Sequence, residues 1–556
     1  MPRLSISRFG LLLGGLMTLL AVFAASVDTV GIYEDEGIYE STAQSMVDGK
    51  GYRIGTLPGS PPNAKYPFFY PAWLALLKWM VPGLGFWKEA VLKLSNLPIL
   101  LLFVWIFYRT LRDQFRWPAT PCQLTAALAG ICGMMMPFAL VMMTEIPFTL
   151  AVWILLRELL FLGNAERRPR WWLVLAMGIA IYYLRTAGAA ILAAVLAFLW
   201  LRGLRRKAAI LLAGWVVAAL PWAVWSRRAA DAFSGQEPLL SKLLAYYISY
   251  DYHTSALLQA AREDGWLPAA GFAATIVLKN MVTFVEGLGE IFFPVTLIYA
   301  SSLVDVTPLL STFLNVFSFT AGVVVAGLVV LGYRQSGIPN KSVLGLAMLF
   351  HIALFVAWPW PFAARFLTPI APLLMIFVAE NVRRWSEHVR LLRATVIVMS
   401  FLLQTWMLAA LFPGGTVISR IFFEENSPYH EGVQWLKERV SGSDVVFSGF
   451  TSQWVGRELG APVVRYNTIL SPKMGLKLQF KINPSDPAYA NEFAARFQEW
   501  KQWAAPRSGR LLIFAEVSLD YPSWQTIHTQ LIHKQLRLVW DQERQPVKIF
   551  EVTESE

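Results

Sequence analysis

The sequence predicts an all-α polytopic membrane domain with about eleven transmembrane helices, followed by a small C-terminal α/β domain outside the membrane. Three observations support this fold class. The 556-residue chain is 56% hydrophobic and has a mean hydropathy of +0.47, more apolar surface than a soluble globular protein needs. Clusters of Arg and Lys recur at every second connection between the apolar runs. Beyond residue 412 no apolar run is long enough to cross a bilayer, which requires ~20 residues.

The apolar runs define the predicted spans, and the basic clusters define their orientation. The runs cover residues 9–29, 88–108, 120–141, 146–163, 171–184, 187–201, 208–226, 312–332, 342–358, 366–380 and 394–412. The basic clusters between them are Arg109/Arg112/Arg116, Arg167/Arg168/Arg170, Arg202/Arg205/Arg206/Lys207, Arg334/Lys341 and Arg383/Arg384/Arg390/Arg393. Because basic loops stay in the cytoplasm, we expect the N-terminus inside and the C-terminus outside. An even number of extra crossings within 227–311 would leave both ends unchanged.

The first apolar run has two interpretations. Arg3 and Arg8 precede it, and Val22-Phe23-Ala24 resembles a cleavage site, as in a secretory signal peptide. The core of a signal peptide is usually only ~7–15 residues long, whereas this uncharged run extends from Phe9 to Val27. We therefore expect an uncleaved first helix.

The predicted orientation places three segments on the external side. Two of them, 30–87 and 227–311, belong to a transmembrane domain of residues 1–412, and the third is 413–556. Residues 72–81 are apolar but too few to span, so we expect a helix at the membrane interface. Segment 227–311 mixes charges, aromatic residues and short apolar runs, which predicts external helices packed on the membrane face.

The composition changes at Pro413-Gly414-Gly415, where the C-terminal domain is predicted to begin. Strands are predicted at 444–448, 462–466, 510–515 and 547–552, and helices at 431–440, 492–504 and 521–533. Strands alternating with helices predict an α/β domain. The sequence of this domain contains neither a glycine-rich phosphate loop nor a nucleophile elbow.

The polar composition favours no other class of protein. The formal net charge of +11 is spread over the loops, so it indicates membrane topology and not a nucleic-acid partner. Cys122 and Cys132 lie within one apolar run and are expected to be packing residues. The six histidines show no metal-ligand spacing.

An acidic stretch follows the first predicted span directly. Glu34, Asp35 and Glu36 lie where the chain leaves the membrane, and carboxylates are costly near lipid. The spacing of Tyr39 and the apolar residues after it predicts a helix that ends at Gly49. In one interpretation Asp35 is only an N-cap and Glu36 a first-turn carboxylate. In the other, a catalytic base is held at the membrane surface.

Three further polar groups recur at the external ends of predicted spans. Glu145 opens the fourth span, Arg185 lies between the fifth and sixth, and Arg365 opens the tenth. Each alone could be an interfacial anchor, because such residues snorkel at helix ends. Together with Lys65 they form a charged cluster on one membrane face, which suits a substrate with an anionic phosphate and a long apolar tail.

The motifs resemble those of the GT-C superfamily of membrane glycosyltransferases, nearest to the protein O-mannosyltransferases and lipid A aminoarabinose transferases. Asp35-Glu36-x-x-Tyr39 resembles their Asp-Glu-x-x-Tyr signature, and Lys65-Tyr66-Pro67 resembles the Lys-Pro-Pro stretch of their first external loop. Thr144-Glu145-Ile146-Pro147-Phe148 and Arg365-Phe366-Leu367-Thr368-Pro369 resemble two further motifs. Ala64 stands where the aminoarabinose transferases carry Glu, and Tyr66 replaces the first Pro. The resemblance therefore leaves the aminoarabinose substrate and a divalent metal undecided.

The resemblance implies that a sugar moves from a polyprenyl-phosphate donor to an acceptor hydroxyl or phosphate of a lipid, glycan or protein. Asp35 is then the base that takes the acceptor proton, and Glu36 is either a second candidate base or an orienting partner. Lys65, Arg365 and Arg185 bind the donor phosphate. Tyr39 and Tyr66 support the site, and Glu145 orients Lys65 or the acceptor.

The resemblance places the protein in the cytoplasmic (inner) membrane of a bacterium, with the C-terminal domain in the periplasm. An oligosaccharide transferase that uses a diphosphate-linked donor is a second possibility within the same class. A transporter or flippase of lipid-linked sugars is the main alternative. Transporters usually show charges near the bilayer midplane and two matching halves, whereas these charges lie at span ends. A receptor or assembly scaffold would leave the acidic stretch without a role.

The predicted topology can be tested with reporter fusions. A reporter fused after Glu556 should be active outside, and one fused after Arg206 should be active inside, because the basic clusters fix the orientation. A cytoplasmic C-terminus would contradict the placement of Glu145, Arg185 and Arg365 on the external face.

Overall fold

The computed structural model describes residues 34–552 with gaps. The gaps are residues 83–86, 133–134, 165–166, 250, 295–307, 360–363, 385–397, 401, 405–427, 442, 449–451, 466–470, 480–486, 508, 517–535 and 542–546. The predicted span 9–29, most of the predicted span 394–412, the predicted boundary at 413–415 and the whole of the predicted helix 521–533 therefore lie outside the described residues.

The chain first forms a short helix and a loop that together carry most of the predicted site. Helix α2 (Glu34–Val47) ends before Gly49, whose φ of +73° is the left-handed conformation that commonly closes a helix. Helix α3 (Phe69–Met80) covers the helix predicted at 72–81, with Trp79 72% exposed on one side and Lys78 buried against Glu40 on the other. Its position at the membrane interface stays a prediction.

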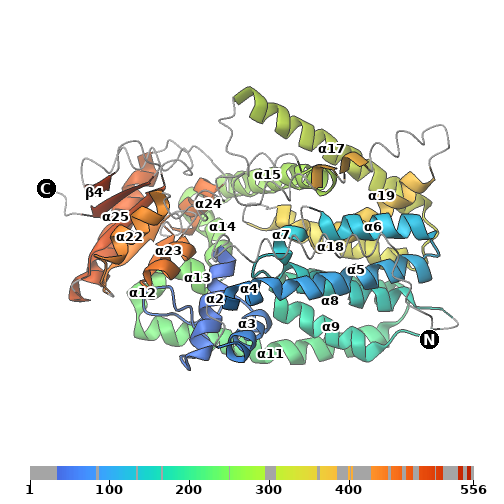
Figure 1. Ribbon diagram of the computed structural model, residues 1–556, viewed down its shortest axis with the longest axis horizontal. Helices are drawn as coiled ribbons and strands as arrows, with labels where there is room; N and C mark the ends of the chain where they lie inside the picture. Colours follow the sequence, from blue (N-terminus) through green and yellow to red (C-terminus); the bar gives the residue numbers. More distant parts are fainter. Residues whose placement is uncertain are drawn as a thin grey trace.

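A bundle of helices follows, and most of them match predicted spans. They are α4 (Trp87–Leu94), α5 (Asn96–Asp113), α6 (Ala119–Ile131), α7 (Met136–Ala139), α8 (Glu145–Leu160), α9 (Trp171–Leu184), the 3-10 turn η1 (Thr186–Gly188) and α10 (Ala189–Leu201). Figure 1 shows α5 beside α6 and α8, and α8 beside α9. The prediction of one span over 120–141 is wrong, because α6 ends at Ile131 and only the single turn of α7 follows it.

Helix α11 (Arg205–Gln236) is longer than the predicted span 208–226. At ~1.5 Å per residue its 32 residues extend ~48 Å, more than the ~30 Å hydrocarbon core of a bilayer. It continues into three shorter helices, α12 (Pro238–Leu243), α13 (Ala245–Ile248) and α14 (Asp251–Asp264). These helices lie between the bundle and the C-terminal sheet in Figure 1.

Four helices among the described residues are long and apolar enough to cross a membrane. They are Ala90–Asp113, Arg205–Gln236, Trp266–Phe292 and Thr312–Gln335, and the shorter apolar helices Trp171–Leu184, Thr186–Leu201 and Lys341–Ala357 accompany them. The chain is thus a polytopic membrane protein. Helix α15 (Trp266–Phe292) is a candidate span within a segment for which we predicted external helices. Its run of Ala, Ile, Val and Phe is interrupted by single polar residues, which disguised its length in the sequence.

The remaining helices of the bundle are α17 (Pro308–Gln335), α18 (Lys341–Ala357), the 3-10 turn η2 (Ala364–Leu367) and α19 (Ala371–Arg383). The predicted tenth span, 366–380, begins as η2 and becomes an α-helix only at Ala371. Pro369 and Pro372 explain this late start, because each lacks a backbone N–H donor.

A buried asparagine fixes the loop that precedes α8. The Asn96 amide lies within 3.0 Å of the carbonyl oxygens of Val141 and Met143 and of the Tyr70 hydroxyl. Buried polar groups of this kind are costly unless they are paired, so the network holds α5, α3 and the loop together. It thereby sets the position of Glu145, the first residue of α8.

The C-terminal part contains a five-stranded sheet in the order β2-β1-β3-β5-β4. β1 (Val445–Ser448) pairs in parallel with β2 (Val463–Arg465) and β3 (Leu511–Glu516), while β5 (Val547–Val552) is antiparallel to β3 and β4 (Leu536–Asp541). The accompanying helices are α22 (Pro428–Lys437), α23 (Ser452–Leu459), α24 (Pro472–Gln479) and α25 (Pro487–Ala504). Four strands match the predicted ones; the edge strand β4 and the short helices α23 and α24 were not predicted.

Candidate active site

Three consecutive carboxylates in the first turn of α2 point to three different neighbours. Successive residues of an α-helix are turned by ~100°, so adjacent side chains leave the axis in separate directions. Glu34 reaches Arg465 of the C-terminal sheet, Asp35 reaches Arg365, and Glu36 accepts a hydrogen bond from the backbone N–H of Met142. The helix begins at Glu34, which places Asp35 within the first turn and not at the N-cap.

Asp35 is held by a cation and a hydroxyl. Its Oδ2 lies 2.8 Å from Nη2 of Arg365, and its Oδ1 accepts a hydrogen bond of 2.7 Å from the hydroxyl of Tyr66. Burial by itself would raise the pKa of the Asp35 carboxyl, but the Arg365 guanidinium and the Tyr66 hydroxyl outweigh it and lower the pKa below its ordinary value. Asp35 is therefore an anion at neutral pH.

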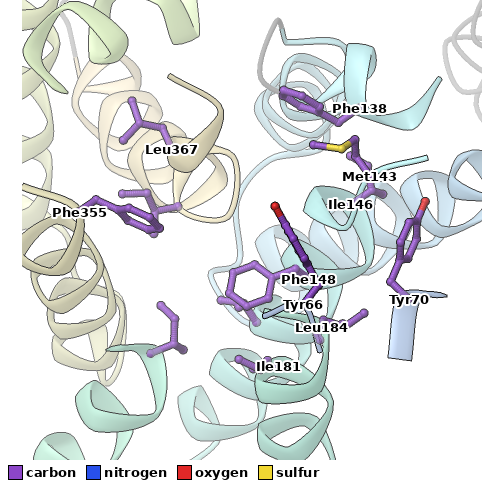
Figure 2. Packing of buried hydrophobic residues seen from close by; sticks show 14 of the residues in the cluster. Tyr66, Tyr70, Phe138, Met143, Ile146, Phe148, Ile181, Leu184, Phe355 and Leu367 are labelled. Carbon is purple, nitrogen blue, oxygen red and sulfur yellow. The ribbon is translucent and has the colours of Figure 1, made fainter. Parts of the chain in front are cut away.

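Asp35 opens onto a cavity of about 380 Å³ that several segments share. Its polar lining comes from Asp35, Tyr39, Lys65, Tyr66, Arg185, Thr186, Tyr246 and Arg365. The remaining wall is apolar and includes Leu184, Phe355 and Trp358. Figure 2 shows Leu184 and Phe355 on different helices around the space into which Tyr66 projects. Three cations and one carboxylate thus face an otherwise apolar chamber.

Lys65 lies on the loop between α2 and α3. Its ammonium donates a 3.0 Å hydrogen bond to the carbonyl of Tyr246 and lies 4.3 Å from the centre of the Tyr246 ring. Burial lowers the pKa of Lys65, and the nearby charges of Asp35 and Glu34 only partly offset this, so the pKa is about 8. Of the cavity's three cations, Lys65 is the one that titrates close to physiological pH.

Arg185 and Glu145 form a second ion pair behind the cavity. Nη1 of Arg185 lies 2.6 Å from Oε1 of Glu145, which is fully buried in the first turn of α8. A carboxylate is favoured there by the helix dipole. Of the two roles expected for Glu145, orienting Lys65 is not met by this geometry, because its carboxylate pairs with Arg185. Orienting the acceptor stays a prediction.

Tyr39 supports the site through its ring. It makes edge-to-face contacts with Tyr66 and Tyr70, with ring centres 5.4 Å and 5.3 Å apart. These contacts hold the Tyr66 ring in position for its hydroxyl to reach Asp35. Glu36, our second candidate base, is fully buried on the Met142 backbone and is not among the residues that line the cavity. The geometry therefore favours Asp35 over Glu36 as the base.

Two parts of the site were not predicted from the sequence. Tyr246, from α13, contributes its carbonyl and its ring to Lys65, and Arg465 pairs with Glu34. The aromatic pair Tyr246-Tyr247 within a charged segment was the available signal for the first; nothing in the local sequence marks Arg465. In the part of the chain that the structure describes, no group of three or more His, Cys, Asp or Glu residues is arranged to hold a metal ion.

The sequence matches no family model and no curated protein. The structure is similar to a crystal structure of ArnT from Cupriavidus metallidurans bound to undecaprenyl phosphate, with a TM-score of 0.54, 12% sequence identity and 98% of each chain covered. The apo form of the same ArnT gives a TM-score of 0.53 at 12% identity, with 97% of each chain covered. The chain has the ArnT fold.

ArnT is a lipid A aminoarabinose transferase of the GT-C class, so the resemblance stated from the motifs is confirmed at the level of the fold. The ArnT fold extends over nearly the whole chain, and it includes the helical bundle as well as the C-terminal sheet. The helices and loops that surround the cavity around Asp35 therefore belong to a fold already seen in solved structures.

The depressed pKa of Lys65 can be measured without any substrate. The neutral amine reacts with amine-selective reagents, so modification of Lys65 in nanodisc-embedded protein should rise with pH through a midpoint near 8. An ordinary lysine has a midpoint near ~10.4. Lys65 binds its proton more tightly in the unfolded chain than in the folded protein. The free energy of unfolding should therefore rise with pH between about 8 and ~10.4. A Lys65 midpoint of about 10 by mass spectrometry would contradict the buried environment.

Proposed function

We propose that this protein is a membrane glycosyltransferase that moves a sugar from a polyprenyl-phosphate donor to an acceptor hydroxyl or phosphate. The observation that carries the proposal is the contact of 2.8 Å between Asp35 and Arg365 in a cavity that Lys65 and Arg185 also line. A base and a set of phosphate ligands are thus adjacent, as transfer from a lipid phosphate requires. The ArnT fold supports it, because one ArnT structure holds undecaprenyl phosphate.

The reaction takes place at the external face of the cytoplasmic membrane. The basic clusters place the end of the bundle that carries Asp35 opposite the cytoplasmic loops. The long apolar tail of the donor stays in the bilayer, while its phosphate enters the cavity. The C-terminal sheet lies at the same end and is periplasmic in this proposal.

The cations of the cavity stabilise the leaving phosphate. The acceptor oxygen forms a bond to the anomeric carbon, and the bond from that carbon to the phosphate oxygen breaks, so the phosphate leaves with the electron pair and one more negative charge. Arg365 and Lys65 balance this charge as it develops, in a chamber whose remaining wall is apolar. Arg185, which Glu145 holds in place, contributes positive charge from the cavity wall.

Asp35 takes the proton of the acceptor hydroxyl. Its pairing with Arg365 makes Asp35 a weak base. The donor phosphate competes for the same guanidinium, and this competition weakens the pairing and raises the proton affinity of Asp35. Donor binding thereby activates the base, and no covalent intermediate with the enzyme is required. The sugar and the acceptor are left open.

Substitution of Asp35 tests the role of the base. Asp35→Asn keeps the size of the side chain and its hydrogen bond to Tyr66 but removes the charge, so transfer should fall by ~10²–10⁴-fold while the protein still inserts and folds. Steady-state transfer from labelled polyprenyl-phosphate sugars by the purified variant measures this. The matched control is Asp48→Asn, a carboxylate after the end of α2 that pairs with Lys50 and does not line the cavity. Near-normal turnover in Asp35→Asn would leave Asp35 a structural residue, and donor movement across the bilayer without transfer would indicate a flippase.

Substitution of Arg365 tests the phosphate ligand. Arg365→Lys keeps a positive charge beside Asp35 but loses the two-pronged geometry that suits a phosphate. The expected loss is ~1.5–3 kcal/mol, or roughly ten- to a hundred-fold in kcat/KM for the donor at saturating acceptor. Arg227→Lys, an 80% exposed arginine, is the control. A change within about twofold would make Arg365 an anchor, and a loss seen only when the acceptor is varied would assign it to the acceptor pocket.

A further inference from the structure

The C-terminal sheet places one of its residues directly against the helix that carries Asp35. Arg465, the last residue of β2, has its Nη1 atom 2.7 Å from Oε2 of Glu34, and only 16% and 10% of the two side chains are exposed. The backbone reinforces this contact, because Val463 donates a hydrogen bond to the carbonyl of Thr56 and Arg465 donates one to the hydroxyl of Tyr247. Figure 1 shows α23 of the same unit beside α2.

Glu34 also connects to the cavity. The hydroxyl of Tyr246 donates a hydrogen bond of 3.2 Å to Oε2 of Glu34, the oxygen that Arg465 contacts. The ring and carbonyl of the same tyrosine hold the ammonium of Lys65. The other oxygen of Glu34 is buried without a hydrogen-bond partner in the described part of the chain. A continuous set of contacts therefore runs from Arg465 through Glu34 and Tyr246 to Lys65.

We propose that Arg465 is a positioning residue of the active site, which neutralises Glu34 and so keeps the Lys65 ammonium available to the donor phosphate instead of paired with this carboxylate. This inference rests on the proposed function, since it takes Lys65 as a ligand of the donor phosphate. It assigns the C-terminal sheet a part in donor binding: the sheet supplies the charge that balances the first carboxylate of α2.

The charges around Lys65 determine what the loss of Arg465 should do. Helix α2 contributes Glu34 and Asp35, α13 contributes Tyr246, η2 contributes Arg365, and Tyr66 lies next to Lys65 on its own loop. Glu34 already acts on the charge of Lys65, and without Arg465 this carboxylate would lose its ion-pair partner. A newly uncompensated carboxylate stabilises a neighbouring ammonium, so Lys65 should hold its proton to higher pH.

The experiment measures Lys65 directly in the full-length protein in nanodiscs, with no donor present. Amine modification of Lys65 is followed by mass spectrometry across the pH range. In Arg465→Gln the midpoint should rise from about 8 by about one pH unit or more. In Glu34→Gln it should fall, and this second variant keeps the test valid if Arg465→Gln does not fold. The Lys65 midpoint of the double variant Glu34→Gln/Arg465→Gln should be lower than that of Arg465→Gln.

The matched control is Arg507→Gln. Arg507 also joins the C-terminal part to another segment, through an ion pair of 3.0 Å with Glu237 between α11 and α12. Neither residue lines the cavity. Its removal should leave the Lys65 midpoint unchanged. A midpoint that stays near 8 or falls in Arg465→Gln, or that rises equally in Arg507→Gln, overturns the positioning role.

Kinetics separate this inference from the proposed function. If the Lys65 midpoint shifts as expected, and the alkaline limb of the pH profile of the donor kcat/KM shifts with it, the positioning role of Arg465 and the proposed function both hold. If the midpoint shifts but transfer shows no dependence on the charge of Lys65, the link between Arg465 and Lys65 stands and the role of Lys65 in the proposed reaction fails. If transfer depends on Lys65 while the midpoint is unaffected by Arg465, the positioning role alone fails.

Discussion

A carboxylate that is removed from water needs a cation or several donors within reach, and this requirement organises the end of the molecule that carries the cavity. The first turn of α2 presents three such groups, and each finds its partner in a different part of the chain. Arg365 comes from a turn between two helices, Arg465 from the C-terminal sheet, and the Met142 backbone from a loop that Asn96 holds in place. The first turn of α2 is therefore where these parts of the fold meet.

The sequence was sufficient to predict most of the membrane bundle, four of the strands and the charged residues that line the cavity, because these depend on local patterns. Apolar length identifies a span, and a charged residue at the end of a span identifies its face. The structure brings Asp35, Lys65, Arg185 and Arg365 around one cavity. Their motif positions and the shared membrane face had indicated this, although neither specifies which cation contacts which anion.

What the sequence did not reveal depends on contacts between distant segments. The pairing of Glu34 with Arg465 joins residues 431 positions apart, and no periodicity reports on such a contact. Among the described strands, edge strand β4 pairs with β5 alone, and Arg537 and Asp541 leave it a shorter apolar run than the one that marked β3. Helix α15 was missed because polar residues such as Asn280 interrupt an otherwise apolar run. In the structure the Asn280 amide donates hydrogen bonds to backbone carbonyls at the end of α18.

The distance along the chain between Glu34 and Arg465 also has a consequence for biosynthesis. A ribosome adds ~5–20 residues per second, so the 431 residues that separate them take roughly 20 to 90 s to make. Throughout that interval the nascent chain already contains Glu34 and Asp35. Arg465, the cation that pairs with Glu34, has not yet been synthesised. The set of charges around the cavity is completed only when the polypeptide is nearly finished, so a truncated translation product that inserts correctly still lacks Arg465.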